Sequence, residues 1–293
     1  MRPRTIPTVW KLLVLGLAYL AVMFFGHLPD HLILFPTRAS IDAGGAIRKM
    51  VPFENGELEI WTAQSRRAKQ QGRADVFILR FYGNADRADR WAAMEVEMWN
   101  DRAVEIWAMN YPGFGGSTGP ARLARIGPAA VAAFDALKSE AADAPIVLYG
   151  ASIGVTAALY LAASRPVEIA GLILHNPPPL REMILRQFGW WNLWLLAAPV
   201  ALQIPRDLDC IANARASRVP AIFLLAERDD IVAPRFHRLV VQAYAGEKRV
   251  IELPGAYHND PVERTALADL NNALGWLLKI GRASCRERVY GLV

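Results

Sequence analysis

Cysteine is scarce in this chain, since its 293 residues include only Cys210 and Cys285. The two cysteines make neither a disulfide framework nor a Cys-x-x-C pair, so zinc sites and redox motifs of that kind are excluded. Cys210 is interpreted as a small, buried or half-buried apolar residue. Nothing in the sequence implies a metal ion or an organic cofactor.

Runs of positive charge are also missing. The formal net charge is +5, but no stretch of five or more Lys or Arg residues occurs, and no aromatic residues interleave with a basic stripe. A nucleic-acid partner is therefore not expected. Internal repeats and low-complexity segments are absent as well. Hydrophobic residues make up 53% of the chain, which is enough to bury a sizeable core in one large domain.

The first feature that is present is an apolar N-terminal segment. The stretch from Val9 to Leu28 supplies about the 20 residues that a helix needs to span a bilayer core of ~30 Å. Lys11 can extend to the interface, and Trp10 suits the headgroup region. We therefore expect residues 1–28 to form an uncleaved signal-anchor, with the membrane as a partner.

Charges beside this segment predict its orientation. Arg2, Arg4 and Lys11 lie at its start, whereas Arg38 alone follows soon after it. This asymmetry predicts a single-pass protein with a cytoplasmic N-terminus and a periplasmic or otherwise extracytoplasmic domain. A cleaved signal peptide is one alternative, although no convincing small-x-small cleavage site follows Phe25, and a buried or surface helix is another.

Residues 29–279 are expected to form one domain in which strands alternate with helices. Two runs of alternating apolar and polar residues around Glu54-Asn55-Gly56 predict a β-hairpin, and later apolar runs are typical of strands buried on both faces. The pattern predicts a mostly parallel sheet with an antiparallel N-terminal hairpin and helices on both faces. The expected strands cover residues 46–53, 57–64, 75–82, 103–111, 145–150, 169–175, 220–226 and 248–253, and the expected helices cover 86–100, 128–142, 152–165, 207–217, 234–245 and 261–279.

Residues 176–205 do not fit the alternation. The segment is rich in Trp and Leu and has no charge between Gly189 and Pro205. It follows a strand end, where α/β folds bind ligands, and it is too apolar to lie fully in water. We interpret it as a short cap insertion, with Trp190 and Trp191 as tentative substrate-pocket residues. A core-packing helix is the alternative.

The tail, residues 280–293, differs from the rest of the chain. From Ile280 to Val289 it matches one reading frame of a common sequencing adapter. We therefore interpret it as foreign and expect the natural chain to continue differently after about Lys279. A genuine basic tail is the alternative.

A Gly-x-Ser-x-Gly pattern lies between an apolar strand and a helix, from Gly150 to Gly154. In this context Ser152 stands on a sharp turn with its hydroxyl exposed, and the small residues at both ends let the helix pack closely. The N-terminus of that helix favours developing negative charge. Ser152 is the candidate nucleophile, with a structural turn serine as the alternative.

A serine hydroxyl needs a base to become a good nucleophile. Among five histidines, His258 alone combines a late loop position with the order Ser, Asp, His that accompanies such a turn. It is the candidate general base, and a structural loop histidine is the alternative. His175 ends a strand and is expected to pack or to line the pocket. His27 and His31 flank the apolar segment, and His237 lies within an expected helix.

An acid is needed to orient the imidazole. Asp229 and Asp230 both follow the strand that ends at Ala226. Asp229 is preferred because of its position in the loop, whereas Asp230 is expected to cap the next turn or face solvent. Asp260 is interpreted as the N-cap of the last helix.

Two backbone donors are needed to stabilise an oxyanion. We expect the N–H groups of Ile153 and Asn84, which lie after the candidate nucleophile and after the strand 75–82. Tyr82 either faces the substrate pocket or packs in the core. The glycine-rich stretch 110–117 lacks the Gly-Lys-Ser/Thr of a phosphate-binding loop, so we interpret it as a tight loop that buttresses the turn at Ser152.

Five motifs, taken in order, resemble the α/β-hydrolase superfamily and within it an N-terminally anchored branch. They are FYGNAD, NYPGFGGSTG, GASIG, ERDDIVAP and GAYHND. The resemblance covers residues 34–279 and implies the α/β-hydrolase fold with Ser152, Asp229 and His258 as catalytic triad. Relatives of this kind include protein depalmitoylases, esterases and lipases.

The chain departs from the motifs of that branch at three places. Tyr82 replaces a usual His, Ala226 replaces a usual Gly, and Ala256-Tyr257 replaces a Gly-Gly pair. None of these changes removes a catalytic group. The expected function is hydrolysis of an ester or thioester, with a small-molecule, acyl or lipid-like substrate and no cofactor. A serine aminopeptidase or amidase is the enzymatic alternative, and an inactive membrane-tethered binding protein is the other.

Overall fold

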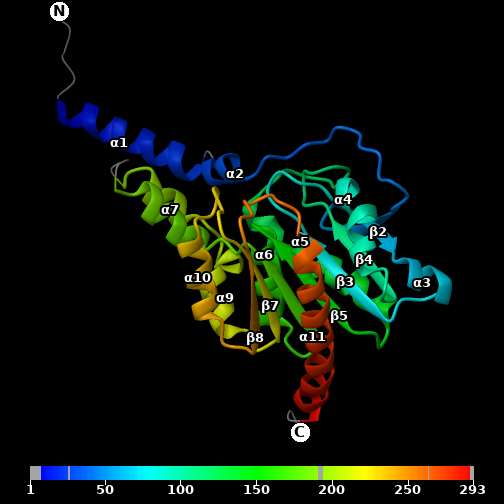
Figure 1. Cartoon of the computed structure of the whole chain (residues 1–293). Helices are drawn as coiled ribbons and strands as arrows, with labels where there is room; N and C mark the ends of the chain where they lie inside the picture. The colour runs from blue at the N-terminus through cyan, green and yellow to red at the C-terminus, as the bar shows by residue number, and fades with distance from the viewer. Residues whose placement is uncertain (1–7, 26, 191–193, 263, 291–293) are drawn as a thin grey trace, which may run out of the picture.

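The computed structural model describes residues 8–25, 27–190, 194–262 and 264–290, and its centre is one eight-stranded sheet between layers of helices (Figure 1). The strand order is β1-β2-β4-β3-β5-β6-β7-β8. The strands are β1 Ile47–Phe53, β2 Gly56–Gln64, β3 Val76–Phe81, β4 Val104–Met109, β5 Ile146–Ala151, β6 Gly171–His175, β7 Ala221–Ala226 and β8 Lys248–Leu253.

The sheet is mixed, as expected. β1 and β2 form an antiparallel hairpin in which Phe53 pairs with Gly56, so Glu54 and Asn55 make the turn. Glu54 has a φ of 51°, a left-handed conformation that a two-residue hairpin turn requires. β2 also pairs antiparallel with β4, whereas all pairs from β4 to β8 are parallel.

Helices cover both faces of the sheet. One face packs on α5, α6, α9 and α10, and the other packs on α4 and α11. All six residues of β3 and of β7 are buried, which explains their continuous apolar sequences. The helices are α1 Thr8–Phe25, α2 Leu28–Ile33, α3 Arg66–Gln71, α4 Ala88–Glu95, α5 Leu123–Ala141, α6 Gly154–Ser164, α7 Leu180–Phe188, α8 Ala197–Leu202, α9 Cys210–Ala216, α10 Pro234–Ala243 and α11 Arg264–Tyr290, with the 3₁₀ helices η1 Val96–Trp99 and η2 Arg206–Leu208.

The start of α5 differs from the expectation that Pro128 begins the helix. α5 begins five residues earlier, at Leu123, and Pro128 lies inside it. Asp30 of α2 explains the earlier start, because its Oδ1 accepts the N–H of Leu123 at 2.7 Å and its Oδ2 accepts a guanidinium hydrogen bond from Arg122 at 3.1 Å. A carboxylate at this position satisfies a free N–H group of the first turn and favours the helix dipole.

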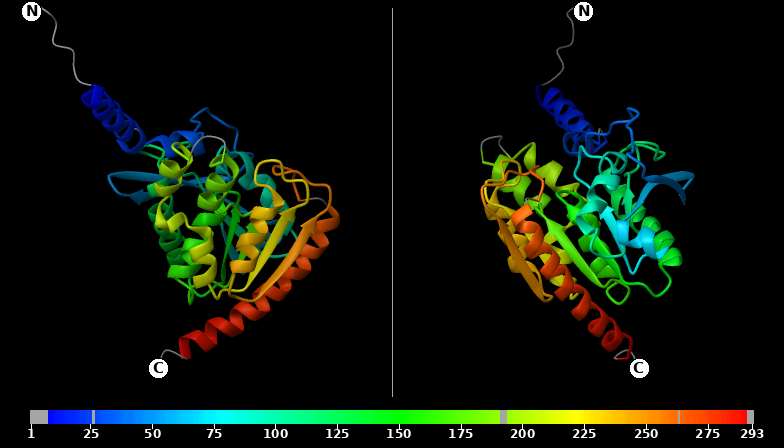
Figure 2. Two further views of the ribbon diagram at one scale, coloured as in Figure 1. Left: turned by 90° about the vertical axis from the view of Figure 1, so that its left-hand side faces the viewer. Right: turned by 45° about the vertical axis from the view of Figure 1, so that its right-hand side comes forward.

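The start of the last helix and the presence of α3 also differ from what the sequence pattern suggested. Asp260 is not the N-cap of the last helix, because α11 begins only at Arg264 and Asp260 instead accepts the N–H of Tyr257 at 2.8 Å. α3 was not anticipated, although Ser65 caps it by accepting the N–H of Ala68 at 3.2 Å. α11 continues to Tyr290, so it runs through most of the tail and extends well beyond the sheet (Figure 2).

The expected cap, 176–205, contains α7 and α8, which pack against each other beside the inner end of α1 (Figure 1). Among the helices of the described ranges, none has the combined length and apolarity that crossing a bilayer requires.

A buried ion pair lies between the sheet and α4. Nε of Arg80 on β3 contacts both carboxylate oxygens of Glu95, at 2.8 and 2.9 Å, and the Tyr82 hydroxyl donates to Glu95 at 2.7 Å. The guanidinium also stacks on the rings of Tyr82 and Tyr149, 4.2 and 3.9 Å from their centroids. The charges of both partners are therefore almost fully enclosed, with side-chain exposures of 7% and 10%.

We predict that Glu95→Ala lowers the free energy of unfolding by about 3–5 kcal/mol, because it leaves the Arg80 charge buried without a counter-ion. The double variant Arg80→Met/Glu95→Met should be more stable than Glu95→Ala, since it leaves no buried charge unpaired. Urea denaturation followed by circular dichroism measures both. Glu97→Ala, at an exposed position in the adjacent turn, is the control. A double variant less stable than Glu95→Ala contradicts this account.

Candidate active site

Ser152 stands on the turn between β5 and α6. Its φ is 50°, a left-handed conformation that is uncommon for any residue but glycine, and its N–H donates to the carbonyl of His175 at 2.8 Å. The glycines on either side are required by close approach. A Cβ on Gly150 would lie 2.5 Å from the carbonyl oxygen of Gly154, and one on Gly154 would lie 2.2 Å from that of Phe81. The first turn of α6 therefore packs directly against the end of β3.

The loop after β3 lies against Ser152. A Cβ built on Gly83 would be 3.7 Å from Cβ of Ser152. The side chain of Asn84 donates to the carbonyl of Ile33 at 2.8 Å, and its own carbonyl accepts the N–H of Phe35 at 3.1 Å. Within the described ranges, the N–H groups of Asn84 and Ile153 have no hydrogen-bond partner. Both remain available to an oxyanion.

The glycine-rich loop after β4 supports the loop after β3 and is built around Glu59 of β2. The Glu59 carboxylate accepts hydrogen bonds from Gly116 N–H at 2.8 Å and from the Asn110 side chain at 2.6 Å. The Tyr111 hydroxyl donates to the carbonyl of Tyr82 at 2.9 Å. Burial alone would raise the pKa of Glu59, but the hydrogen bonds from Gly116, Asn110 and Arg48 lower it. The contact that the structure shows from this loop is thus with the end of β3 and the loop after it, whereas the expected support was for the turn at Ser152.

Asp229 and His258 meet at the carboxyl edge of the sheet. His258 Nδ1 lies 2.6 Å from Asp229 Oδ2, and the Asp229 side chain is fully enclosed. The other oxygen, Oδ1, accepts the N–H groups of Ile231 and Val232 at 2.9 and 2.6 Å. Asp230, the alternative acid, is exposed.

The environment of Asp229 keeps it ionised. Burial by itself would raise the pKa of this carboxyl, but hydrogen bonds from His237 and His258, the charge of His258 and the N–H of Val232 hold the pKa well below its ordinary range. Because a carboxylate only accepts hydrogen bonds, His258 must donate through Nδ1, which leaves Nε2 as the atom that can accept a proton.

Asn176, which follows β6, connects three strand ends. Its side-chain Nδ2 donates to the carbonyl of His258 at 3.0 Å, and its Oδ1 accepts the N–H of Ala226 at 2.9 Å. The preceding residue, His175, accepts the N–H of Ser152. The backbones of Ser152 and His258 are thus bonded to neighbouring residues of one strand end. In the described part of the chain, neither Ser152 Oγ nor His258 Nε2 has a hydrogen-bond partner.

Of the tentative pocket residues, two lie in the core. Tyr82 is 3% exposed and donates its hydroxyl to Glu95, which is the packing alternative. His175 is 9% exposed, and its Nε2 is enclosed without a partner among the described residues. Burial, followed by the nearby Arg80 charge, lowers the pKa of His175 to about 3, so this ring is neutral. Trp190 is 77% exposed, and Trp191 lies outside the described residues.

Sequence reasoning missed two residues of this site, Asn176 and His237. His237 of α10 lies 2.9 Å from Asp229 Oδ2 through its Nε2. His237 lies inside an expected helix, and this position did not suggest a contact with Asp229, although the two residues are only eight positions apart in the chain. Asn176 carries one usable signal, since Asn is enriched at left-handed positions and its φ is 50°. The described residues contain no group of three His, Cys, Asp or Glu side chains that could hold a metal ion.

Comparisons with known proteins agree with this architecture. No family model matches the chain. An uncharacterized protein of Mycobacterium tuberculosis, Rv2307c, is 27% identical over 269 residues, which cover 89% of this chain and 90% of that protein. The alpha/beta hydrolase domain-containing protein aho-3 of Caenorhabditis elegans is 27% identical over 158 residues, which cover 53% of this chain and 44% of that protein.

Solved structures share the fold. The esterase Pf2001 of Pyrococcus furiosus superposes with a TM-score of 0.60 at 15% sequence identity, covering 85% of this chain and 98% of that one. With its eight-stranded, mostly parallel sheet and its N-terminal antiparallel hairpin, the protein has the α/β-hydrolase fold.

We predict that Asn176→Ala lowers the free energy of unfolding by about 2–3 kcal/mol, because it removes two buried hydrogen bonds and puts Ala in a left-handed conformation. Activity should fall more steeply than stability explains, since the loop of His258 loses a contact. Denaturant titration and hydrolytic turnover at a temperature where both proteins are folded measure the two effects. Asn272→Ala, at an exposed position of α11, is the control. Wild-type stability in Asn176→Ala would refute the connecting role.

Proposed function

We propose that this protein is a serine hydrolase that cleaves a carboxylic ester or thioester through an acyl-enzyme. The observation that carries the proposal is the 2.6 Å contact between His258 and the buried Asp229. Ser152 is left-handed and donates its N–H to His175, the residue before Asn176, whose side chain contacts the loop of His258. This is the constellation of nucleophile, base and orienting acid that acyl transfer needs. Similarity to an alpha/beta hydrolase domain-containing protein supports the same class.

In the proposed mechanism, Ser152 Oγ attacks the acyl carbon while His258 Nε2 takes its proton. Asp229 stabilises the imidazolium that forms, and the N–H groups of Ile153 and Asn84 stabilise the oxyanion. The imidazolium then gives its proton to the leaving alcohol or thiol, and a water molecule, activated by the same imidazole, hydrolyses the acyl-enzyme.

The substrate class that we propose is acyl or lipid-like, because the surface of the cap that follows β6 is strongly apolar. Trp190, Leu195 and Leu202 in the cap are 77%, 59% and 76% exposed. An aminopeptidase or amidase would need polar or charged groups to hold a peptide amine. The charged residues of the cap lie in α7, and none occurs between Gly189 and Pro205.

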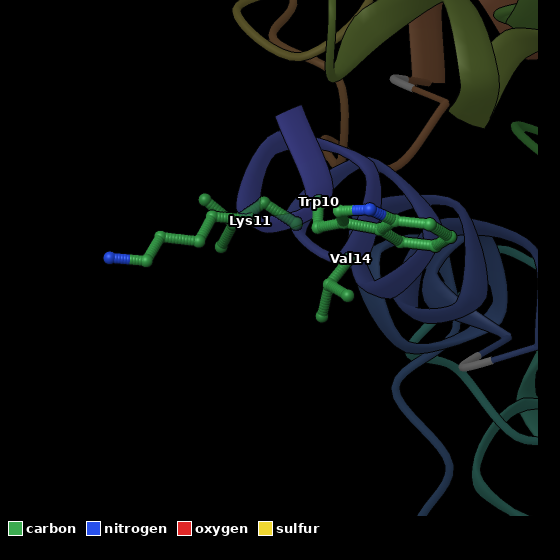
Figure 3. A pocket seen from close by; sticks show the side chains of 4 residues that line it. Trp10, Lys11 and Val14 are labelled. Carbon is green, nitrogen blue, oxygen red and sulfur yellow. The ribbon is translucent and has the colours of Figure 1, made fainter. Parts of the chain in front are cut away.

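We also propose that the membrane is a partner, and that α1 binds to the lipid surface without crossing the bilayer. The exposed apolar residues of α1 support this, since Val9, Leu12, Val14, Leu15, Leu17 and Val22 are 60–67% exposed. Trp10 and Val14 lie on the open surface of α1, and Lys11 extends away from it (Figure 3). A helix that is apolar on all sides requires apolar surroundings.

α1 also contacts the cap, which would bring both to the same lipid surface. The Tyr19 hydroxyl donates to the carbonyl of Leu195, and the side chain of Gln203 donates to the carbonyl of Met23 at 2.8 Å. Figure 2 shows α1 leaving the molecule on the side of the cap.

For the chemistry, we predict that a fluorophosphonate probe labels the wild-type protein and does not label Ser152→Ala. Turnover of p-nitrophenyl esters should fall by about 10⁴-fold or more in that variant, since the nucleophile is lost. Ser139→Ala, at an exposed helix position, is the control and should match the wild type. An unlabelled wild-type protein supports the inactive binding protein instead. Faster cleavage of aminoacyl-anilides than of esters of any chain length would overturn the substrate class.

For the membrane, we predict that the full chain floats with vesicles of phosphatidylethanolamine and phosphatidylglycerol. Leu12→Asp/Leu15→Asp should weaken binding by more than about 100-fold, because each exposed Leu contributes roughly 1.5–3 kcal/mol when buried in lipid. Ile47→Asp, which alters an apolar residue 66% exposed on β1, should float like the wild type. Equal flotation of all three proteins, or none for the wild type, counts against a lipid contact through α1.

A further inference from the structure

The Asp229 carboxylate contacts two histidines through a single oxygen. His258 Nδ1 is 2.6 Å and His237 Nε2 is 2.9 Å from Oδ2. The mechanism above uses only His258. His237 is 1% exposed, so it lies inside the protein and meets no solvent.

The other side of the His237 ring is also occupied. Its Nδ1 lies 3.2 Å from the carbonyl of Pro177, the residue that follows Asn176. A carbonyl and a carboxylate are both acceptors, so His237 donates to both at once only when the ring carries two protons. In that form it is a cation in contact with the Asp229 carboxylate, and it connects α10 to the loop after β6.

We propose that His237 is a positioning residue that fixes Asp229 and moderates the hydrogen bond that Asp229 accepts from His258. The inference rests on the proposed function. Two donors on one oxygen divide its charge between them, so each hydrogen bond is weaker than it would be alone. His237 thereby limits how strongly Asp229 holds the Nδ1 proton of His258.

Few other groups face this pair. Oδ1 of Asp229 accepts the backbone N–H groups of Ile231 and Val232, which carry no titratable proton. His175 lies near enough to affect both histidines, but burial lowers its pKa to about 3 and it stays neutral through the working range. Arg80 is the nearby permanent charge and does not titrate. A change in pH dependence on altering His237 therefore reports on Asp229 and His258.

The test compares ester turnover by the full chain across pH for wild type, His237→Ala and His237→Gln. The Gln amide can reach the place of Nε2 and donate to Asp229, whereas Ala cannot. We expect His237→Ala to lower kcat by about 10-fold or more, as for loss of a buried hydrogen bond to a charged group. KM should not change. His237→Gln should recover a large part of kcat.

The direction in which the pH profile of kcat/KM moves distinguishes a positioning role of His237 from a role in stabilising the fold. Without His237, Oδ2 has only His258 as a donor, so the imidazolium form of His258 is better stabilised. The acid limb of kcat/KM should then move to higher pH in His237→Ala and less in His237→Gln. Gln242→Ala, at an exposed position on α10, is the control and should keep the wild-type profile.

Each other outcome overturns the proposal. An unchanged acid limb in both variants, with equal losses of kcat, means that His237 only stabilises the fold. Wild-type kinetics in His237→Ala means that Asp229 needs no second histidine. If the Ala variant does not fold, His237→Leu, which fills more of the same space and also cannot donate to Asp229, replaces it in the comparison with His237→Gln, and an acid limb at the wild-type pH in His237→Leu overturns the positioning role. Turnover that survives in Ser152→Ala removes the proposed function itself, and this inference with it.

Discussion

The structure of the site depends on one buried carboxylate with four hydrogen-bond donors. Asp229 receives two from backbone N–H groups and two from histidines, and its side chain is fully enclosed. A buried charge without such partners would be strongly destabilising. The donors come from the loop after β7, from α10 and from the loop after β8. The charge therefore fixes the relative positions of three segments before any substrate arrives.

Much of this arrangement could be predicted from the sequence, because it follows from local patterns. Continuous apolar runs indicated the buried strands, and the turn at Glu54 indicated the antiparallel hairpin. Ser152 could be located because a Gly-x-Ser-x-Gly sequence between strand and helix forces a left-handed turn, and the φ of 50° agrees. In a parallel sheet the carboxyl ends of the strands share an edge, so residues after β5, β7 and β8 meet there.

The sequence could not predict contacts between segments that are distant in the chain. The start of α5 depends on Asp30, which is 93 residues before Leu123, so Pro128 misled a local argument. Asn176 contacts a carbonyl 82 residues away. His237 looked like an ordinary helix residue because nothing local indicates that one turn of α10 faces the carboxylate. Tyr82 is similar, since its hydroxyl finds Glu95 only after α4 has packed.

The segment that joins α1 to the sheet has a mechanical consequence. Asp30 holds the start of α5, and the carbonyl of Ile33 accepts the side chain of Asn84 at 2.8 Å. A force applied to α1 would thus be transmitted through these hydrogen bonds to the loop after β3, which carries the proposed oxyanion donor Asn84. Through these hydrogen bonds the N-terminal segment is held against the sheet domain, so it does not act as a flexible linker. A pulling force on this end of the chain, or its removal, would therefore change how firmly the loop at Asn84 is held.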